Sequence, residues 1–438
     1  MNKRTVSVGL MLFALFFGAG NLIFPPQIGQ SAGGEVWPAM LGFFITGVGL
    51  PLLAIIAMAV TGGGLQGLTE RVHPVFGIVF PIILYAAIGP LFGIPRTGNV
   101  AYEMGVVPFL PERLAAQPLP LFLTTIVFFG VTYWLCLNPS KLVDRIGNIL
   151  TPALLIIIGA VMVKASIDPI GPIGATAETY ENNPMTKGFM DGYLTMDTLG
   201  ALAFGIVVIN AVKQNGVTGK RMTRMVIQAG AIAGICLAAV YFVLAYLGAT
   251  SHSLGSAENG GQILNAVVYE LFGPSGNVLL GAAVVLACLT TSIGLITACA
   301  QYGVKVFPRV SYKKIVLLLS IFSLAVANIG LNQLITVSVP VLTAIYPLAI
   351  VLIVLSLVHP AIKGRAEVYQ GSLLLTAAVS AIDGLKAAGI EISMVESVLR
   401  SLPMYTEGLG WLIPAVIGAF LGYGMTLVSS NSKLKTEN

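Results

Sequence analysis

Twelve long apolar runs dominate this chain of 438 residues. A helix needs roughly 20 mostly apolar residues to cross the hydrocarbon core of a bilayer, and the runs are about that long. The predicted spans are 5–29, 36–61, 75–95, 119–138, 146–164, 188–212, 223–248, 276–304, 315–331, 334–357, 369–387 and 410–429. The sequence therefore predicts an all-α integral membrane protein with about 12 transmembrane helices.

Composition supports a lipid environment. Only 9% of the residues are charged and 56% are hydrophobic, whereas a soluble domain carries roughly 25% charged residues. The net charge of +5 does not indicate a nucleic-acid partner, because the basic residues lie in short loops between apolar runs. All four cysteines lie inside apolar runs and form no C-x-x-C pair, so we expect free thiols.

The distribution of Lys and Arg predicts the orientation of the chain. With the loops assigned to alternate sides, one side holds 17 of the 23 basic residues and the other holds six, among them Arg96. Because positive loops stay in the cytoplasm, we expect both termini there. Trp37 and Trp411 fall at the outer ends of their spans and Trp134 near an inner end, so we expect them to anchor the protein at the membrane interfaces.

The first span is interrupted at 18–26, which reads GAGNLIFPP. Gly costs about 1 kcal/mol in a helix interior and Pro about 3, and a broken helix in hydrocarbon leaves amides and carbonyls that need polar partners. A bound substrate or ion would be such a partner. The alternative is that Gly18 and Gly20 only allow close helix packing. Asn21 and the double proline favour the break.

The sixth span contains a carboxylate in the sequence TMDTLG at 195–200. Charges inside a membrane are costly, so Asp197 is a functional candidate. The alternative is that Asp197 lies at the outer mouth, solvated beside Asp191. Spans one and six occupy equivalent places if the chain contains two five-helix repeats of opposite orientation. Paired interruptions are typical of transporters that bind their substrate between such repeats.

Span eight carries adjacent hydroxyl groups in the sequence ACLTTS at 287–292. Hydroxyl and carbonyl oxygens are hard ligands that suit alkali cations. The alternative is that these side chains bond back to carbonyls of their own helix, as Ser and Thr commonly do in membranes.

Three stretches together resemble the bacterial branched-chain amino acid:cation symporter family, and the likeness runs through nearly the whole chain. They are LFFGAGNLIFPP at 15–26, IGPLFGIPRTG at 88–98 and CLTTSIG at 288–294. That family is similar to LeuT-type carriers, whose first ten helices form two inverted repeats. The resemblance implies repeats at 1–164 and 165–357, two further helices within 358–438, and a place in the bacterial cytoplasmic membrane.

The resemblance also implies the binding residues. The substrate would meet backbone amides at the break in span one, facing the break in span six, beside an apolar cleft. The implied substrate residues are Ala19, Gly20 and Asn21, facing Thr198, Leu199 and Gly200. Asp197 joins them as the intramembrane carboxylate, and Tyr85 and Phe204 are expected, with Leu199, in the apolar cleft that a branched side chain needs. The implied Na⁺ ligands are the carbonyls of Ala14 and Phe17 with Ala287, Thr290 and Thr291, and an alternative register uses Cys288, Thr291 and Ser292.

The expected function is import of leucine, isoleucine or valine with Na⁺ by alternating access, with no other cofactor and no obligate protein partner. Proton coupling is the alternative, because Asp197 could titrate. A channel is disfavoured, since no filter motif or ring of like charges occurs. An enzyme is not expected: His73, His252 and His359 lie in loops or at span ends, and neither H-E-x-x-H nor a phosphate loop is present.

Overall fold

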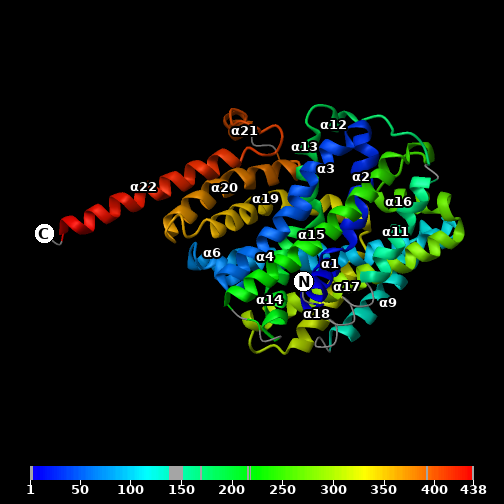
Figure 1. Ribbon diagram of the computed structural model, residues 1–438, viewed down its shortest axis with the longest axis horizontal. Coiled ribbons are helices and arrows are strands. Elements are labelled where there is room, and N and C mark those ends of the chain that lie inside the picture. The colour runs from blue at the N-terminus through cyan, green and yellow to red at the C-terminus, as the bar shows by residue number, and fades with distance from the viewer. Residues whose placement is uncertain are drawn as a thin grey trace.

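The computed structural model describes residues 3–137, 151–167, 170–214, 217, 219–390 and 393–436. Within these ranges the chain is helical and contains no strand. Figure 1 shows a helical body from which the C-terminal part of α22 projects. The predicted all-α class is confirmed.

The first part of the chain holds three pairs of helices joined by short breaks or irregular turns. Its helices are α1 (Lys3–Phe16), α2 (Ala19–Ala32), α3 (Val36–Phe44), α4 (Leu50–Thr61), α5 (Gly64–Thr69), α6 (Pro74–Ala86), α7 (Gly93–Gly105), α8 (Glu112–Ala115), α9 (Pro118–Cys136) and α11 (Thr151–Ile167). A π-helical turn, η2 (Ile45–Gly49), joins α3 to α4, and another, η3 (Ala87–Leu91), joins α6 to α7.

The second part contains a similar interrupted helix, α13 to α14, followed by five helices, α15 to α19. Its helices are α12 (Glu178–Glu181), α13 (Pro184–Asp191), the 3-10 turn η7 (Gly192–Thr195), α14 (Asp197–Gln214), α15 (Gly219–Ala249), α16 (Gly260–Phe272), α17 (Pro274–Val306), α18 (Tyr312–Ala327) and α19 (Leu331–Leu357). Then follow α20 (Ala366–Ala387), α21 (Ser393–Leu399) and α22 (Leu412–Thr436), with α20 packed between α19 and α22 (Figure 1).

Seven helical stretches of the described residues are long and apolar enough to cross a membrane. They are Ala19–Thr61, Pro74–Phe109, Pro118–Cys136, Gly219–Ala249, Pro274–Val306, Leu331–Leu357 and Ala366–Ala387. Three shorter apolar helices, Arg4–Phe16, Leu155–Ala165 and Leu412–Thr426, add to them. The chain is thus a multi-pass membrane protein, whereas the count of 12 spans stays a prediction.

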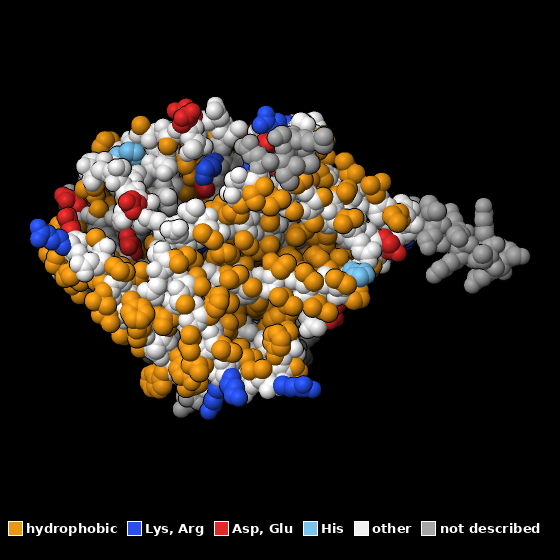
Figure 2. All heavy atoms as spheres, turned by 180° about the vertical axis from the view of Figure 1, so that it is seen from behind, with side chains coloured by type: hydrophobic (Ala, Val, Ile, Leu, Met, Phe, Trp, Pro, Cys, Tyr) orange, Lys and Arg blue, Asp and Glu red, His pale blue; other side chains and the backbone are white. Residues whose placement is uncertain are grey.

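Large hydrophobic side chains cover the outside of the body. Ile235 and Leu374 are both 71% exposed, and Figure 2 shows such side chains across the middle of one face, with several Lys and Arg side chains at its lower edge. Soluble proteins rarely expose apolar patches of this extent. A surface of this kind is suited to contact with lipid.

Glycines let α2 and α15 approach closely where they cross. A Cβ atom at Gly29 would lie 2.0 Å from the carbonyl oxygen of Ala245, and one at Gly248 would lie 2.0 Å from that of Pro26. Only glycine permits this approach, which is a common way for membrane helices to pack. The contact fixes α2 beside α15, and α7 packs similarly along α17. These four helices surround the breaks described below.

The structure corrects two expectations and confirms one. Trp411 is 2% exposed and lies in the hydrophobic core, so its assignment as an interfacial anchor is wrong, whereas Trp134 is 68% exposed. Arg96 does not lie in an outer loop, because the chain continues past Pro95 as helix α7 and buries it. Pro95 is tolerated there because it sits in the first turn of that helix. The four cysteines are free, as predicted.

Candidate functional site

The first span is broken at Phe17 and Gly18, between α1 and α2. In a continuous helix the Gly18 amide would bond to the carbonyl of Ala14, but it donates to Asn21 Oδ1 at 3.1 Å instead. The break therefore leaves carbonyls at the end of α1 and amides in the first turn of α2 without helical partners. It is shorter than expected, since the double proline lies inside α2.

The sixth span is broken between η7 and α14. Met196 has a φ of 62°, the left-handed region that side chains other than glycine rarely adopt. This residue ends η7, and α14 begins at Asp197, whose amide donates to Thr195 Oγ1 at 3.3 Å. Backbone strain at such a position costs on the order of 1–3 kcal/mol and is concentrated at functional sites.

A third interruption lies between α6 and α7, inside the predicted span 75–95, where Pro90 and Pro95 break the apolar run. Gly89 has non-helical angles, φ −87° and ψ −120°, and is followed by Pro90. The amide of Phe92 then bonds to the carbonyl of Ala87 at 3.2 Å, which is a π-type spacing. The kink allows Gly93 and the residues after it to reach the centre of the protein.

A buried polar cluster connects the first two breaks. Asn21 Nδ2 donates to Asp197 Oδ2 at 2.6 Å, and the Tyr241 hydroxyl donates to the same oxygen at 3.0 Å. Asp197 is 5% exposed, so it is not solvated at an outer mouth. Asp191, which could have shared that mouth, pairs instead with Lys187 and accepts a bond from Tyr180. Burial raises the pKa of that tyrosine well above its usual value.

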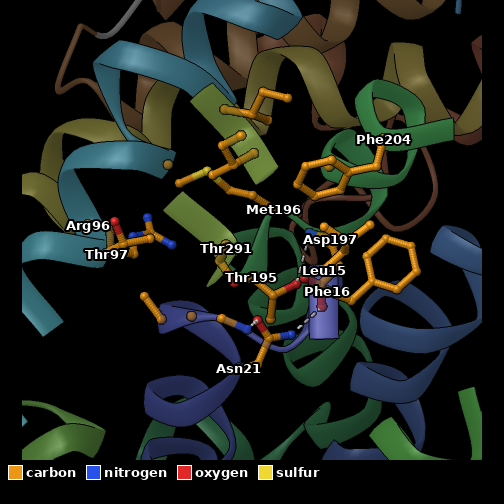
Figure 3. A pocket seen from close by; sticks show the side chains of 17 residues that line it. Leu15, Phe16, Asn21, Arg96, Thr97, Thr195, Met196, Asp197, Phe204 and Thr291 are labelled. Atoms are coloured by element: carbon orange, nitrogen blue, oxygen red, sulfur yellow. Dashed lines mark hydrogen bonds between the residues drawn. The ribbon is translucent and has the colours of Figure 1, made fainter. Parts of the chain in front are cut away.

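The breaks surround one central cavity of about 50 Å³ (Figure 3). It is lined by Leu15, Phe16, Gly18, Ala19, Gly20, Asn21, Ile88, Gly93, Arg96, Thr97, Thr195, Met196, Asp197, Gly200, Phe204, Thr291 and Leu295. On this measure a cavity needs roughly 10–15 Å³ to hold one water molecule, and sites for small molecules usually have about 300–1,000 Å³. The cavity is therefore small for an amino acid.

Most of the expected substrate residues line this cavity, namely Ala19, Gly20, Asn21, Asp197, Gly200 and Phe204. Three others do not. Thr198 donates to the carbonyl of Thr46 at 3.1 Å, and Leu199 is fully buried in the core. Tyr85 lines a second cavity of about 410 Å³, where its ring stacks on Tyr302 with 4.3 Å between centroids.

Sequence reasoning missed part of the lining. Those residues are Leu15, Phe16, Gly18, Ile88, Gly93, Arg96, Thr97, Thr195, Met196 and Leu295. Several of them stand within the stretches 15–26 and 88–98 that carry the family resemblance, so that signal pointed to them without assigning a role. Arg96 is the most informative omission, because it is a buried cation beside the cavity.

The hydroxyls of α17 lie opposite the end of α1. Thr291 Oγ1 lines the cavity and lies 3.5 Å from the carbonyl oxygen of Phe17. Thr290 donates to the carbonyl of Ala287 in its own helix at 2.8 Å. Ser292 Oγ is buried and has no partner within the described part of the chain. Thr291, which both cation registers share, is therefore the hydroxyl that faces the break.

Comparisons with solved structures identify the fold. Mhp1, a nucleobase-cation-symport-1 family transporter, in a closed conformation with bromovinylhydantoin bound, superposes with a TM-score of 0.62 at 15% identity, over 98% of this chain and 93% of its own. MhsT in complex with L-phenylalanine gives a TM-score of 0.57 at 15% identity, over 96% of this chain and 98% of its own. These matches confirm the LeuT-type fold.

Sequence comparisons identify the family. The branched-chain amino acid permease BraB of Bacillus subtilis is 52% identical over 99% of this chain and 98% of its own length. The permease BrnQ of Escherichia coli K12 is 42% identical over 95% of this chain and 94% of its own. Residues 1–429 match the family described as branched-chain amino acid transport protein. The chain belongs to the branched-chain amino acid transport protein family.

Proposed function

We propose that this protein imports leucine, isoleucine and valine by symport with Na⁺ through alternating access. The observation that carries the proposal is that two interrupted helices meet at one buried cavity and are joined by the bond between Asn21 and Asp197. Transporters with inverted repeats hold their substrates at such paired breaks. The names of the relatives, branched-chain amino acid permeases, support the substrate class.

The cavity offers complementary chemistry for such a substrate. The amides of Ala19 and Gly20 stand in the first turn of α2, where the partial positive charge of a helix N-terminus favours a carboxylate. Asp197 offers a negative charge for the ammonium group. The apolar lining suits a branched aliphatic side chain, since burying apolar surface is favourable; it comprises Leu15, Phe16, Ile88, Phe204 and Leu295.

Na⁺ would bind between the end of α1 and α17. The carbonyls of Ala14 and Phe17 are candidate ligands from the break, and Thr291 faces Phe17 from the other side. Either Ala287 with Thr290, or Cys288 with Ser292, would complete the set. An ion there would tie α1 to α17 and so stabilise one arrangement of the breaks.

Proton coupling is a second candidate, and the burial of Asp197 favours it. A carboxylate inside a membrane protein is costly when charged, and the donors Asn21 and Tyr241 that bond to Asp197 are neutral. Protonation of that carboxylate could accompany each transport cycle in place of Na⁺.

The second cavity supports an inward release path. Ile88 and Leu295 line the central cavity. Tyr85 and Ala298, each three residues away from one of them, line the second cavity. Both pairs are three residues apart, so about one helical turn separates the two cavities. Lys305, which the charge distribution places on the cytoplasmic side, lines the second cavity. Motion of repeat 1–164 against repeat 165–357, beside the helices of 358–438, would join the central cavity to the second cavity.

Labelled isoleucine uptake into proteoliposomes tests the proposal. The Na⁺ and proton gradients are imposed separately, and we expect saturable, electrogenic uptake driven by Na⁺ alone. Uptake driven only by the proton gradient would establish the second candidate instead. Uptake that does not saturate would indicate a channel, and recovery of chemically altered substrate would indicate an enzyme.

A further inference from the structure

Arg96 is a buried cation whose hydrogen-bond partners in the described part of the chain are neutral. Its side chain, 2% exposed, donates to the carbonyl of Leu194 and to Ser338 Oγ, and its guanidinium lies 5.5 Å from the ring centroid of Phe24. Its Nε is buried and has no hydrogen-bond partner among the residues that the structure describes. Among the described residues, no carboxylate forms an ion pair with it.

Such an arrangement is costly unless it serves a ligand. A charge removed from water loses its hydration, and neutral acceptors replace only part of that loss. Charged residues inside membrane proteins are therefore rare and mark substrate or ion pathways. The bonds to Leu194 and Ser338 hold the guanidinium between η7 and α19, so its position is fixed rather than free to move toward solvent.

A buried acid of opposite charge lines the same cavity. Figure 3 shows Arg96 and Asp197 on different sides of the cavity, with Thr195 and Thr291 between them in this view. The hydrogen bonds of Asp197 come from the neutral donors Asn21 and Tyr241. Among the described residues neither group has an ion-pair partner within 4 Å, and the two opposite charges attract each other across the cavity without touching. A zwitterionic α-amino acid presents the complementary pair of charges.

We propose that Arg96 is the counter-charge for the substrate carboxylate, and that Arg96 and Asp197 together select α-amino acid zwitterions over amines and carboxylic acids with the same carbon skeleton. This inference rests on the proposed function. The substrate carboxylate would then bind both the amides at the start of α2 and the side chain of Arg96. A guanidinium suits the role because its donors lie in a plane that matches a carboxylate and it stays charged when buried.

Ligand-dependent thermal stabilisation of the purified protein in detergent tests the inference. L-leucine, leucinamide and 4-methylpentanoate are titrated against the wild type and Arg96→Gln. We expect the wild type to bind leucine far more tightly than either analogue. In Arg96→Gln the affinity for leucine should fall by about 30-fold or more, because the carboxylate loses a buried partner. The affinity for leucinamide should change by less than about 3-fold, because leucinamide has no carboxylate. The preference of Arg96→Gln for leucine over leucinamide should therefore be about 10-fold or more weaker than that of the wild type.

Arg113→Gln is the matched control, because it makes the same substitution at an exposed arginine that does not line the cavity. Its affinities, and its preference for leucine over leucinamide, should stay as in the wild type. An unchanged preference in Arg96→Gln would overturn the inference and leave the proposed function standing. If Arg96→Gln does not fold, the wild type alone decides, since equal affinity for leucine and the two analogues would overturn the inference. A wild type that binds no leucine would overturn the proposed function itself.

Discussion

Asn21 Nδ2 donates a hydrogen bond of 2.6 Å to Asp197 Oδ2, although the two residues are 176 positions apart in the chain. Asn21 belongs to the first turn of α2 and Asp197 begins α14, so the bond connects the two helices that start in the middle of the protein. Tyr241 adds a bond from α15 to the same oxygen. A substrate that moves one break must therefore move the other or break this bond.

Removal of the Asn21 side chain tests the importance of that connection. Asn21→Ala leaves the buried carboxylate of Asp197 with one donor fewer and frees the amide of Gly18. A hydrogen bond to a charged group contributes about 1.5–3 kcal/mol, so the apparent affinity for isoleucine should fall roughly 10-fold to 150-fold. Asn328→Ala is the control, because Asn328 bonds to Thr125 and lies outside the cavity. Equal uptake curves for the two variants would contradict the prediction.

Gly20 tests the close approach at the break in α2. A Cβ atom there would lie 3.2 Å from Thr195 Cα and 3.3 Å from its carbonyl oxygen, so any larger side chain presses the two breaks apart. We expect Gly20→Leu to abolish isoleucine uptake while the protein is still inserted in the membrane. In Gly130→Leu the new Cβ meets nothing within 4 Å, so uptake should continue. Normal transport by Gly20→Leu would remove this glycine from the site.

Cysteine labelling tests the predicted orientation. Lys220 and Arg221 are exposed at the start of α15, on the side that the charge distribution places in the cytoplasm. In a variant without the native cysteines, Lys220→Cys should resist an impermeant thiol reagent on intact cells and react in inside-out vesicles. Ser256→Cys, in an exposed loop on the predicted outer side, should show the reverse. Labelling of Lys220→Cys from outside would invert the proposed topology.

The sequence predicted the features that depend on composition and local chemistry. Long apolar runs require helices in a membrane, and the glycines near Asn21 and the carboxylate of Asp197 identified two breaks that the structure also contains. The positions of both breaks were predicted to within a few residues. Asp197 was placed in the same cluster as Asn21, which the structure shows as a direct bond.

What the sequence could not predict depends on packing between distant segments. Arg96 was assigned to a loop because the predicted span ended at Pro95. In the structure the chain kinks at Gly89 and continues past Pro95 as helix α7, which the distribution of charges does not reveal. Trp411 was assigned to the interface because its place near a span end says nothing about which face is covered. Tyr85 stands three residues before Ile88 and lines a different cavity, because it lies about one turn farther along the same side of the helix and the sequence does not show where one cavity ends.

Thr291 gives the sharpest test of the Na⁺ site. Its hydroxyl lies 3.5 Å from the carbonyl oxygen of Phe17, across the gap between α17 and the end of α1. Loss of one neutral oxygen ligand should cost about 1–3 kcal/mol, or roughly 5-fold to 150-fold in apparent affinity for Na⁺. Thr291→Ala should therefore need more Na⁺ for half-maximal isoleucine uptake. Its substrate affinity should fall at low Na⁺ and recover at saturating Na⁺, because binding at the two sites is linked.

The neighbours of Thr291 decide the register of that site. If Thr290 is a ligand, Thr290→Ala should shift the Na⁺ curve and Ser292→Ala should not; the alternative register predicts the reverse. The Thr290 hydroxyl donates to the carbonyl of Ala287 in its own helix. Ser292 Oγ has no hydrogen-bond partner within the described residues. Thr290→Ala therefore removes a hydrogen-bonded hydroxyl, and Ser292→Ala removes one without a partner there. The measurement is uptake against Na⁺ concentration for all three variants. Curves that overlap with the wild type for Thr291→Ala would end the Na⁺-site proposal, because both registers require this hydroxyl.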